Sequence, residues 1–158
     1  MYSKLLVAYK FGERFNGELS PRGGINLYNL HAQSHDGKVL FTVNKPPRPA
    51  YQDKIKKIIL MTKDGSFAIL ANVDYLGRFS TISYYPIPDG YTVPSIWENE
   101  DTDKLGWYAL SNLKTISIQH GMFRSVNDRD LLDSMSGNAY MTYVSLDESS
   151  NCVSNFSE

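Results

Sequence analysis

The chain has a single cysteine and no long apolar run, and these two features argue against a disulfide-linked protein and against a membrane-spanning one. Cys152 is the one cysteine in 158 residues, so no internal disulfide can form, as is typical of proteins from a reducing compartment. Near the start, the apolar run from Leu5 to Ala8 is too short for the core of a signal peptide. No stretch approaches the roughly 18 apolar residues of a membrane span. We therefore expect a cytoplasmic protein that makes no membrane contact.

The sequence also lacks the common catalytic and nucleotide-binding motifs. GxxxxGK[ST], GxGxxG, GxSxG, HExxH and CxxC are all absent, so the usual signatures of nucleotide, hydrolase and zinc sites are missing. The formal net charge of −1 predicts no bulk attraction to nucleic acid or to an anionic membrane, so such binding requires a local patch. We predict no catalytic residue, no metal and no cofactor.

Short alternating runs of apolar residues, bounded by Gly, Pro and Asn, predict a β-rich domain. Strands are expected over 4–10, 38–44, 55–62, 66–75, 79–85, 107–119 (as one long or two short strands) and 139–146. Short helices are expected over 25–32 and over 126–135, the second capped by Asn127. Turns are expected at 76–78 and at Asp64-Gly65, where the dipeptide favours type I′.

Successive strands joined by tight turns favour an antiparallel barrel or a rolled sheet. We predict a mainly β (α+β) fold, a small antiparallel pseudo-barrel with two or three short helices. Residues 1–146 would form one domain, and 147–158 would form a polar tail.

Charge is distributed unevenly along the chain. Between residues 38 and 63 there is one acid, Asp53, against the bases Lys38, Lys45, Arg48, Lys54, Lys56, Lys57 and Lys63. The segment 89–103 has no base and carries the acids Asp89, Glu98, Glu100, Asp101 and Asp103. A basic stretch around a proline-rich loop suits contact with phosphates, although edge-strand lysines that oppose aggregation give the same pattern.

Aromatic residues are abundant, at 13% of the chain, with eleven tyrosines and two tryptophans. Tyr84, Tyr85, Tyr91, Trp97, Trp107 and Tyr108 gather within 82–110. Rings displayed on loops can sandwich a flat base, and the alternative is ordinary core packing.

The three histidines offer weaker patterns. His31 and His35 have the spacing of two metal ligands on one helix face, with Asp36 or His120 as a third ligand. His31 and His120 could also serve as an acid–base pair for RNA cleavage. The acids of 89–103 lack the fixed spacing of a calcium loop, which favours a solvated loop.

Several segments together resemble the PUA-like superfamily, and within it the EVE and YTH-like domains. The resemblance covers residues 25–120 and rests on the strand and proline loop GKVLFTVNKPP (37–47), on the strands 55–61 and 67–74, and on PSIW (94–97) followed by GWYALSNLK (106–114). It implies a small pseudo-barrel that binds DNA or RNA and holds a base, modified or not, in an aromatic pocket. It also implies a role in sensing nucleic-acid modification, including phage–host defence.

Carried over by position, the resemblance implies a base pocket formed by Thr42, Asn44, Asp74, Tyr75, Trp97 and Trp107. The basic residues Lys45, Arg48, Lys54, Lys56 and Lys57 are expected to contact the nucleic-acid backbone. The first alternative is a protein–protein interaction module or inhibitor that uses the acidic aromatic loop 89–107. The second is a small nuclease that depends on His31 or His120.

Overall fold

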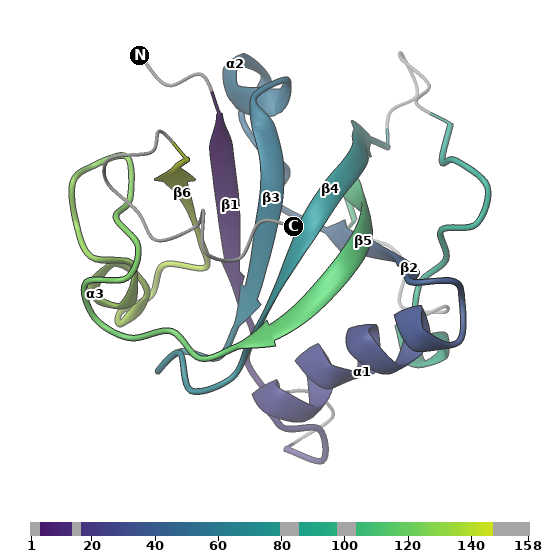
Figure 1. The fold of residues 1–158 in the computed structure, drawn as a ribbon, viewed down its shortest axis with the longest axis horizontal. Coiled ribbons are helices and arrows are strands. Elements are labelled where there is room, and N and C mark those ends of the chain that lie inside the picture. Colours follow the sequence, from purple (N-terminus) through teal and green to yellow (C-terminus); the bar gives the residue numbers. More distant parts are fainter. Residues whose placement is uncertain (1–3, 14–16, 80–85, 98–103, 147–158) are drawn as a thin grey trace.

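The protein is described from a computed structural model, which defines residues 4–13, 17–79, 86–97 and 104–146. Six strands form one sheet in the order β2–β5–β4–β3–β1–β6 (Figure 1). In chain order the elements are β1 (Leu5–Lys10), α1 (Pro21–Gln33), β2 (Lys38–Val43), α2 (Pro49–Gln52), β3 (Ile55–Met61), β4 (Ala68–Arg78), the 3-10 turn η1 (Ser95–Trp97), β5 (Gly106–Ile116), α3 (Leu131–Met135) and β6 (Met141–Ser145).

The mainly β class is confirmed, but the sheet is mixed and is not closed into a barrel. β1 pairs in parallel with β3, and the other neighbouring strands of the sheet pair antiparallel. The parallel pair arises because α1, β2 and α2 lie between β1 and β3 in the chain, which gives the crossover that parallel strands require. β2 and β6 are the two ends of the strand order, so the sheet stays open between them.

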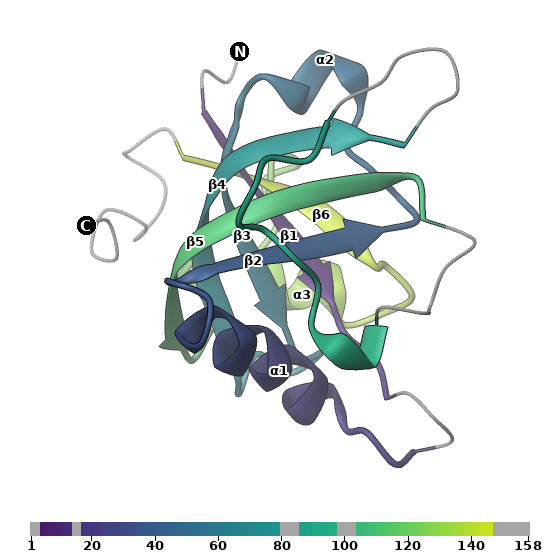
Figure 2. The same cartoon turned by 90° about the vertical axis from the view of Figure 1, so that its right-hand side faces the viewer.

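The open sheet is nevertheless strongly curved (Figure 2). β5, β4 and β3 separate β2 from β1 in the strand order, yet the rings of Phe41 on β2 and Tyr9 on β1 lie with centroids 5.3 Å apart. Helix α1 fills the concave side, where Ile25, Tyr28 and Ala32 join the same buried cluster as Tyr9 and Phe41. The curvature therefore brings the two edges of the sheet near each other without joining them.

Strand β1 is buried on both faces, which explains its unbroken apolar sequence. Leu5 and Val7 pack in the cluster on the α1 side, whereas Leu6 and Ala8 pack in the cluster that contains α3. The two helices thus cover opposite faces of the sheet (Figure 1).

Helix α1 begins at Pro21, earlier than the start predicted at residue 25. The Ser20 side chain caps the helix by accepting from the backbone N–H of Gly23 at 3.0 Å, and proline suits the first turn because it has no N–H to satisfy. Gly23 and Gly24 lie inside this helix, although glycine disfavours helix interiors. Gly24 is buried, where a Cβ would lie 3.5 Å from the Phe11 ring.

The turn predicted at 76–78 is wrong, because β4 continues through these residues. Gly77 lies opposite Trp107 and Arg78 opposite Gly106 in the ladder with β5. The glycine was a misleading turn signal, since strand pairing decides the conformation here. Of the two alternatives left open for 107–119, one long strand or two short ones, the structure has the single long strand β5.

The helix predicted over 126–135 is shorter than expected. Asp128 has a positive φ of 63°, and the backbone N–H of Ser125 donates to the Arg129 carbonyl at 2.7 Å, so these residues form a tight turn. Helix α3 then begins after Asp130, whose carboxylate, rather than the Asn127 side chain, caps it by accepting from the backbone N–H of Leu132 at 3.1 Å.

The hairpin predicted at Asp64-Gly65 is present between β3 and β4, but its turn is not type I′. The backbone N–H of Gly65 donates to the Thr62 carbonyl at 3.0 Å, so the central residues of the turn are Lys63 and Asp64. Neither has the positive φ that type I′ needs, and Gly65, with a φ of +76°, follows them. The strand predicted over 79–85 lies outside the described residues apart from Phe79, and the polar tail 147–158 lies outside them entirely.

Candidate functional site: an aromatic pocket between the sheet edges

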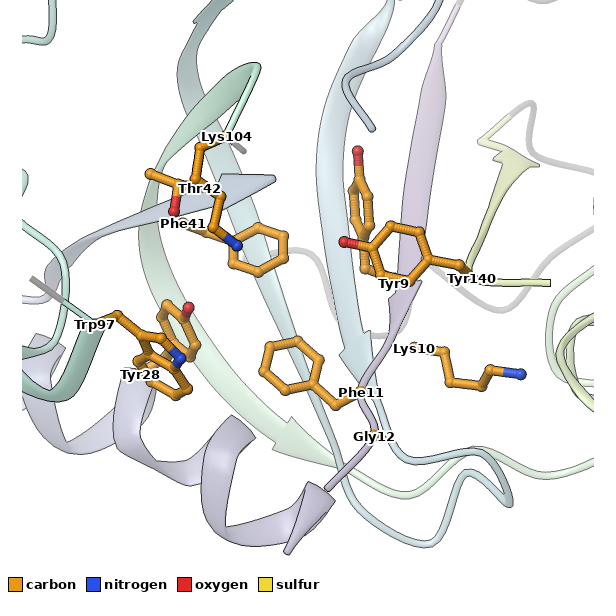
Figure 3. Close-up of a pocket in the computed structure, with 10 residues that line it drawn as sticks. All are labelled: Tyr9, Lys10, Phe11, Gly12, Tyr28, Phe41, Thr42, Trp97, Lys104 and Tyr140. Atoms are coloured by element: carbon orange, nitrogen blue, oxygen red, sulfur yellow. The ribbon is translucent and has the colours of Figure 1, made fainter. Parts of the chain in front are cut away.

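A pocket opens between the β2 edge and the end of the sheet formed by β1 and β6 (Figure 3). It contains about 520 Å³ of empty space including its open mouth, of which about 90 Å³ is available to the centres of water-sized molecules. Its walls comprise the aromatic residues Tyr9, Phe11, Tyr28, Phe41, Trp97 and Tyr140 together with Lys10, Gly12, Thr42 and Lys104. The enclosed part is smaller than a drug-sized site of roughly 300–1,000 Å³, and its size suits one small flat group.

The aromatic walls are held by ring–ring contacts. Trp97 of η1 stacks on Tyr28 of α1, with centroids 5.0 Å apart and planes inclined by 21°. Phe11 stacks on Phe41 at 5.9 Å, and Tyr9 meets Tyr140 edge to face at 5.6 Å. Because offset-stacked and edge-to-face pairs are the favoured geometries, the pocket is shaped before any ligand enters.

The hydroxyl of Tyr9 takes part in a buried hydrogen-bond chain. It donates to the Lys45 carbonyl at 2.8 Å and lies 2.8 Å from the Tyr108 hydroxyl, which donates to it in turn. Burial, the largest cause, and the neighbouring tyrosines raise the pKa of Tyr9 far above its usual value. Burial likewise raises the pKa of Tyr108. Both side chains therefore stay neutral, and the pocket floor carries no negative charge from them.

The two lysines of the pocket point in different directions. The ammonium of Lys10 donates to the carbonyls of Met135 at 2.9 Å and Gly137 at 2.7 Å, on the far side of β1. Its pKa is lowered by burial and by the charge of Lys63. Figure 3 shows the Lys104 side chain directed toward the space between Phe41 and Tyr140. Lys104 thus supplies the cation at the mouth.

The structure brings two of the six base-pocket residues expected from the sequence into this pocket. Thr42 and Trp97 line it, and Asn44 is exposed just beyond the end of β2. Trp107 lies on the other face of the sheet, 3% exposed, in a cluster with Leu40, Ala109 and Tyr91. Adjacent strand residues alternate between faces, so Trp107 and the concave-side Tyr108 cannot share a site.

Asp74 and Tyr75 also lie away from the aromatic pocket. Asp74 accepts hydrogen bonds from the Tyr91 hydroxyl at 2.7 Å and the Ser111 hydroxyl at 3.0 Å. Tyr75 is 56% exposed. Both border a more open polar depression that also includes Lys56, with about 230 Å³ available to the centres of water-sized molecules.

The five expected backbone-binding residues are placed around α2 and the start of β3. Lys45 and Arg48 are exposed in the loop between β2 and α2. Lys56 is exposed and donates to the Asp53 carbonyl at 3.3 Å, and Lys57 donates to the Asn72 side chain at 2.7 Å. Lys54 is half-buried between them. Lys45 is connected to the pocket directly, because its carbonyl binds Tyr9.

The histidines considered for a metal or a nuclease have different neighbours. The rings of His31 and His35 stack with centroids 3.8 Å apart, and His31 Nε2 lies 2.8 Å from the Thr92 hydroxyl. His120 Nε2 lies 3.3 Å from an Asp133 carboxylate oxygen. The acids Glu98, Glu100, Asp101 and Asp103 lie outside the described residues.

One group of metal-ligand atoms was not anticipated. His120, Asp130 and Asp133 each offer an atom within 4.8 Å of the others. Asp130 has a structural role that accounts for its position, since its carboxylate accepts from the backbone N–H groups of Gly121 and Leu132. The group therefore belongs to the cap of α3.

Sequence reasoning missed most of the pocket wall. Tyr9, Phe11, Tyr28 and Phe41 are ordinary members of apolar patterns, and nothing in their spacing indicates that they meet. One usable signal was Tyr28, which shares a helix face with Ile25 and Ala32 and so had to contact the sheet.

Comparison with known proteins finds no matching family model, no matching curated protein and no matching solved structure. None of the helices in the described part of the chain has the length and apolar character needed to cross a lipid bilayer.

Proposed function

We propose that this protein is a cytoplasmic, PUA-like nucleic-acid-binding domain that holds one unpaired base, plain or modified, in the aromatic pocket. The observation that carries the proposal is a preformed pocket with six aromatic residues in its wall: Tyr9, Phe11, Tyr28, Phe41, Trp97 and Tyr140. Stacking of a base on an aromatic ring contributes about 1–3 kcal/mol. The base must be single-stranded or flipped out, because pairing and stacking in a duplex cover its edges and faces.

Polar groups at the mouth support this ligand class. Thr42 and Lys104 lie on one side of the opening, and Tyr140 reaches across from the other side (Figure 3). Hydroxyl and ammonium groups around an apolar floor are suited to hydrogen bonds with the edge of a base, and a nearby ammonium also suits a phosphate. Lys45 and Arg48 are the exposed bases of the adjoining loop.

The two tryptophans provide the test, because the chain has no others and they lie on opposite faces of the sheet. In a Trp107→Phe variant, Trp97 is the sole tryptophan reporter. Titration with single-stranded DNA or RNA should quench its fluorescence, and plain and methylated bases should differ in affinity. In a Trp97→Phe variant the same titration should leave the emission of Trp107 unchanged.

The variant Trp97→Ala tests whether this ring contributes to the affinity for oligonucleotides. Loss of the stacking wall should weaken oligonucleotide binding by about 5- to 150-fold, as expected for about 1–3 kcal/mol. Circular dichroism should confirm that the variant is folded. Wild-type affinity in folded Trp97→Ala protein, or no quenching of Trp97 by any oligonucleotide, contradicts the proposal.

A second candidate function, docking of a protein partner, is supported by the outer face of the sheet. Tyr75, Phe79 and Leu105 are 56%, 42% and 53% exposed, and Phe79 and Leu105 are joined by a backbone hydrogen bond of 3.0 Å. Large exposed apolar side chains often mark interaction surfaces. A Phe79→Ser, Leu105→Ser double variant that keeps full oligonucleotide affinity but loses a co-purifying protein would favour this function.

A further inference from the structure

Tyr9 belongs to two parts of the molecule at once. Its ring lines the aromatic pocket, with edge-to-face contacts to Phe41 and Tyr140. Its hydroxyl donates to the carbonyl of Lys45, in the loop that follows β2. A pocket residue is therefore bonded to the backbone of a loop that carries exposed positive charge.

This basic loop, residues 45–48, spans the gap between the two sheet edges. It leaves the end of β2, and the backbone N–H of Arg48 donates to the hydroxyl of Tyr143 on β6 at 2.9 Å. In the middle of the loop, the Arg78 guanidinium of β4 donates to the Pro47 carbonyl. Strands β1, β4 and β6 thus hold the loop, and the side chains of Lys45 and Arg48 are left at the surface.

The hydrogen bond from Tyr9 holds the backbone of Lys45, the first basic residue of the loop. Lys45 directly precedes Pro46, which packs closely against Gly106 of β5. A Cβ added to Gly106 would lie 2.7 Å from the Cβ of Pro46. With its carbonyl bound to Tyr9 and the next residue packed on β5, Lys45 has little freedom to move away from the pocket. The backbone of Lys45 is consequently held beside Tyr9 in the pocket wall, and its exposed side chain extends from that point.

From this geometry we infer that the ligand is a polynucleotide, bound by its base in the pocket and by its backbone on the basic loop, with Tyr9 as the positioning residue that couples the two. The inference rests on the proposed function and adds to it the loop that distinguishes a strand from a free nucleotide, together with the residue that positions this loop. A free nucleotide would use the pocket alone. A strand engages Lys45 and Arg48 as well, and each contacted phosphate releases counterions when a single strand binds.

Tyr9→Phe tests the coupling, because it keeps the pocket ring and removes the bond to Lys45. The probes are single-stranded DNA oligomers of about six nucleotides, within the site sizes of single-strand binders, and the matching nucleoside 5′-monophosphates. The plot of log affinity against log salt should become shallower by about 0.7, the contribution of the single phosphate contact that Lys45 makes. Arg48 should keep its contact, because the bond from its backbone N–H to Tyr143 remains. The ratio of affinities between the best and the worst base should not change.

Two further variants serve as a control and as a replacement in case Tyr9→Phe does not fold. Tyr91→Phe removes a hydroxyl on the opposite face of the sheet and leaves the Tyr9–Lys45 bond, so the wild-type salt slope is expected. If Tyr9→Phe fails to fold because the Tyr108 hydroxyl loses its partner, the double variant Tyr9→Phe, Tyr108→Phe leaves neither hydroxyl unpaired. The same decrease in slope is then expected from the double variant.

The outcomes separate the two proposals. A wild-type salt slope in folded Tyr9→Phe protein, or monophosphates that bind as tightly as oligomers, overturns the coupling and leaves the base pocket standing. If neither oligomers nor monophosphates quench Trp97, the base pocket itself is wrong.

Discussion

Tyr91 combines burial, a hydrogen bond and a cation contact in one side chain on the outer face of the sheet. It covers Trp107, it donates to Asp74 at 2.7 Å, and the Lys38 ammonium lies 5.4 Å from its ring centroid. Burial, followed by the bond to the Asp74 carboxylate, raises the pKa of Tyr91 to about 12 from a usual value of 10.0. The neutral hydroxyl is therefore the form that the folded state favours.

This shift predicts a loss of stability in alkali. Because the folded-state pKa lies above the unfolded value, the contribution of Tyr91 is complete below pH 10 and is lost as the pH rises toward 12. In this window the free energy of unfolding should fall more steeply in the wild type than in Tyr91→Phe, by up to about 1.4 kcal/mol per pH unit. Urea unfolding at several pH values measures both slopes. Equal slopes in the two proteins would show that Tyr91 does not titrate in this range.

At the scale of elements, the hairpin between β3 and β4 depends on one glycine. Gly65 adopts a φ of +76°, and a Cβ at this position would lie 2.6 Å from the Leu132 side chain and 2.8 Å from the carbonyl oxygen of Ile118. Its backbone also bonds to that segment, because the N–H of Ile118 donates to the Gly65 carbonyl at 2.7 Å. The turn thus joins the hairpin to the chain that leads toward α3.

Gly65→Ala should therefore be far more destabilising than a matched change at Gly37. Gly37 has a similar φ of +79°, but nothing lies within 4 Å of its Cβ position. We expect Gly37→Ala to cost about 1–2 kcal/mol from the left-handed backbone alone. Gly65→Ala adds a clash with a backbone oxygen and should lower the free energy of unfolding by roughly 2 kcal/mol more. Similar losses in chemical denaturation would mean that the hairpin moves to accommodate the methyl group.

At the scale of the whole molecule, the opening between β2 and β6 is the dominant feature. Side chains from both edges, from α1 and from η1 line it, and the basic loop crosses it. A strand bound along this opening would contact parts of the protein that are distant in the sheet order, and so should stabilise the whole fold rather than one element.

Ligand binding should accordingly raise global stability. At a free oligonucleotide concentration of 100 times the Kd, the free energy of unfolding should increase by about 2.7 kcal/mol, provided that the unfolded chain does not bind. Thermal unfolding with and without oligonucleotide measures the gain, and the same total concentration should stabilise Trp97→Ala much less. Hydrogen exchange should slow at β2 and at the start of β6. An equal gain in the Trp97→Ala variant would place the binding elsewhere.

The amino-acid sequence by itself determined the strands and the presence of a helix before residue 33. Period-two alternation and unbroken apolar runs are local signals, so β1, β2, β3 and β6 lie close to their predicted places. The local signals failed where distant contacts outweighed them. Gly77 continues a strand because β5 pairs with it, and the Gly23–Gly24 pair is helical because Ser20 caps the helix and Phe11 packs against Gly24.

The tertiary structure alone decided the order of the strands, the opening of the sheet and the composition of the pocket. The family resemblance could nominate Trp97 and Thr42, but nothing in the sequence could bring Tyr9, Tyr28 and Phe41 to them, because these contacts depend on how β1, α1 and β2 cross in space. It also could not separate Trp97 from Trp107, which lie on opposite faces. Burial patterns repeat along the chain, whereas a binding site is defined by residues that meet only after the sheet has curved.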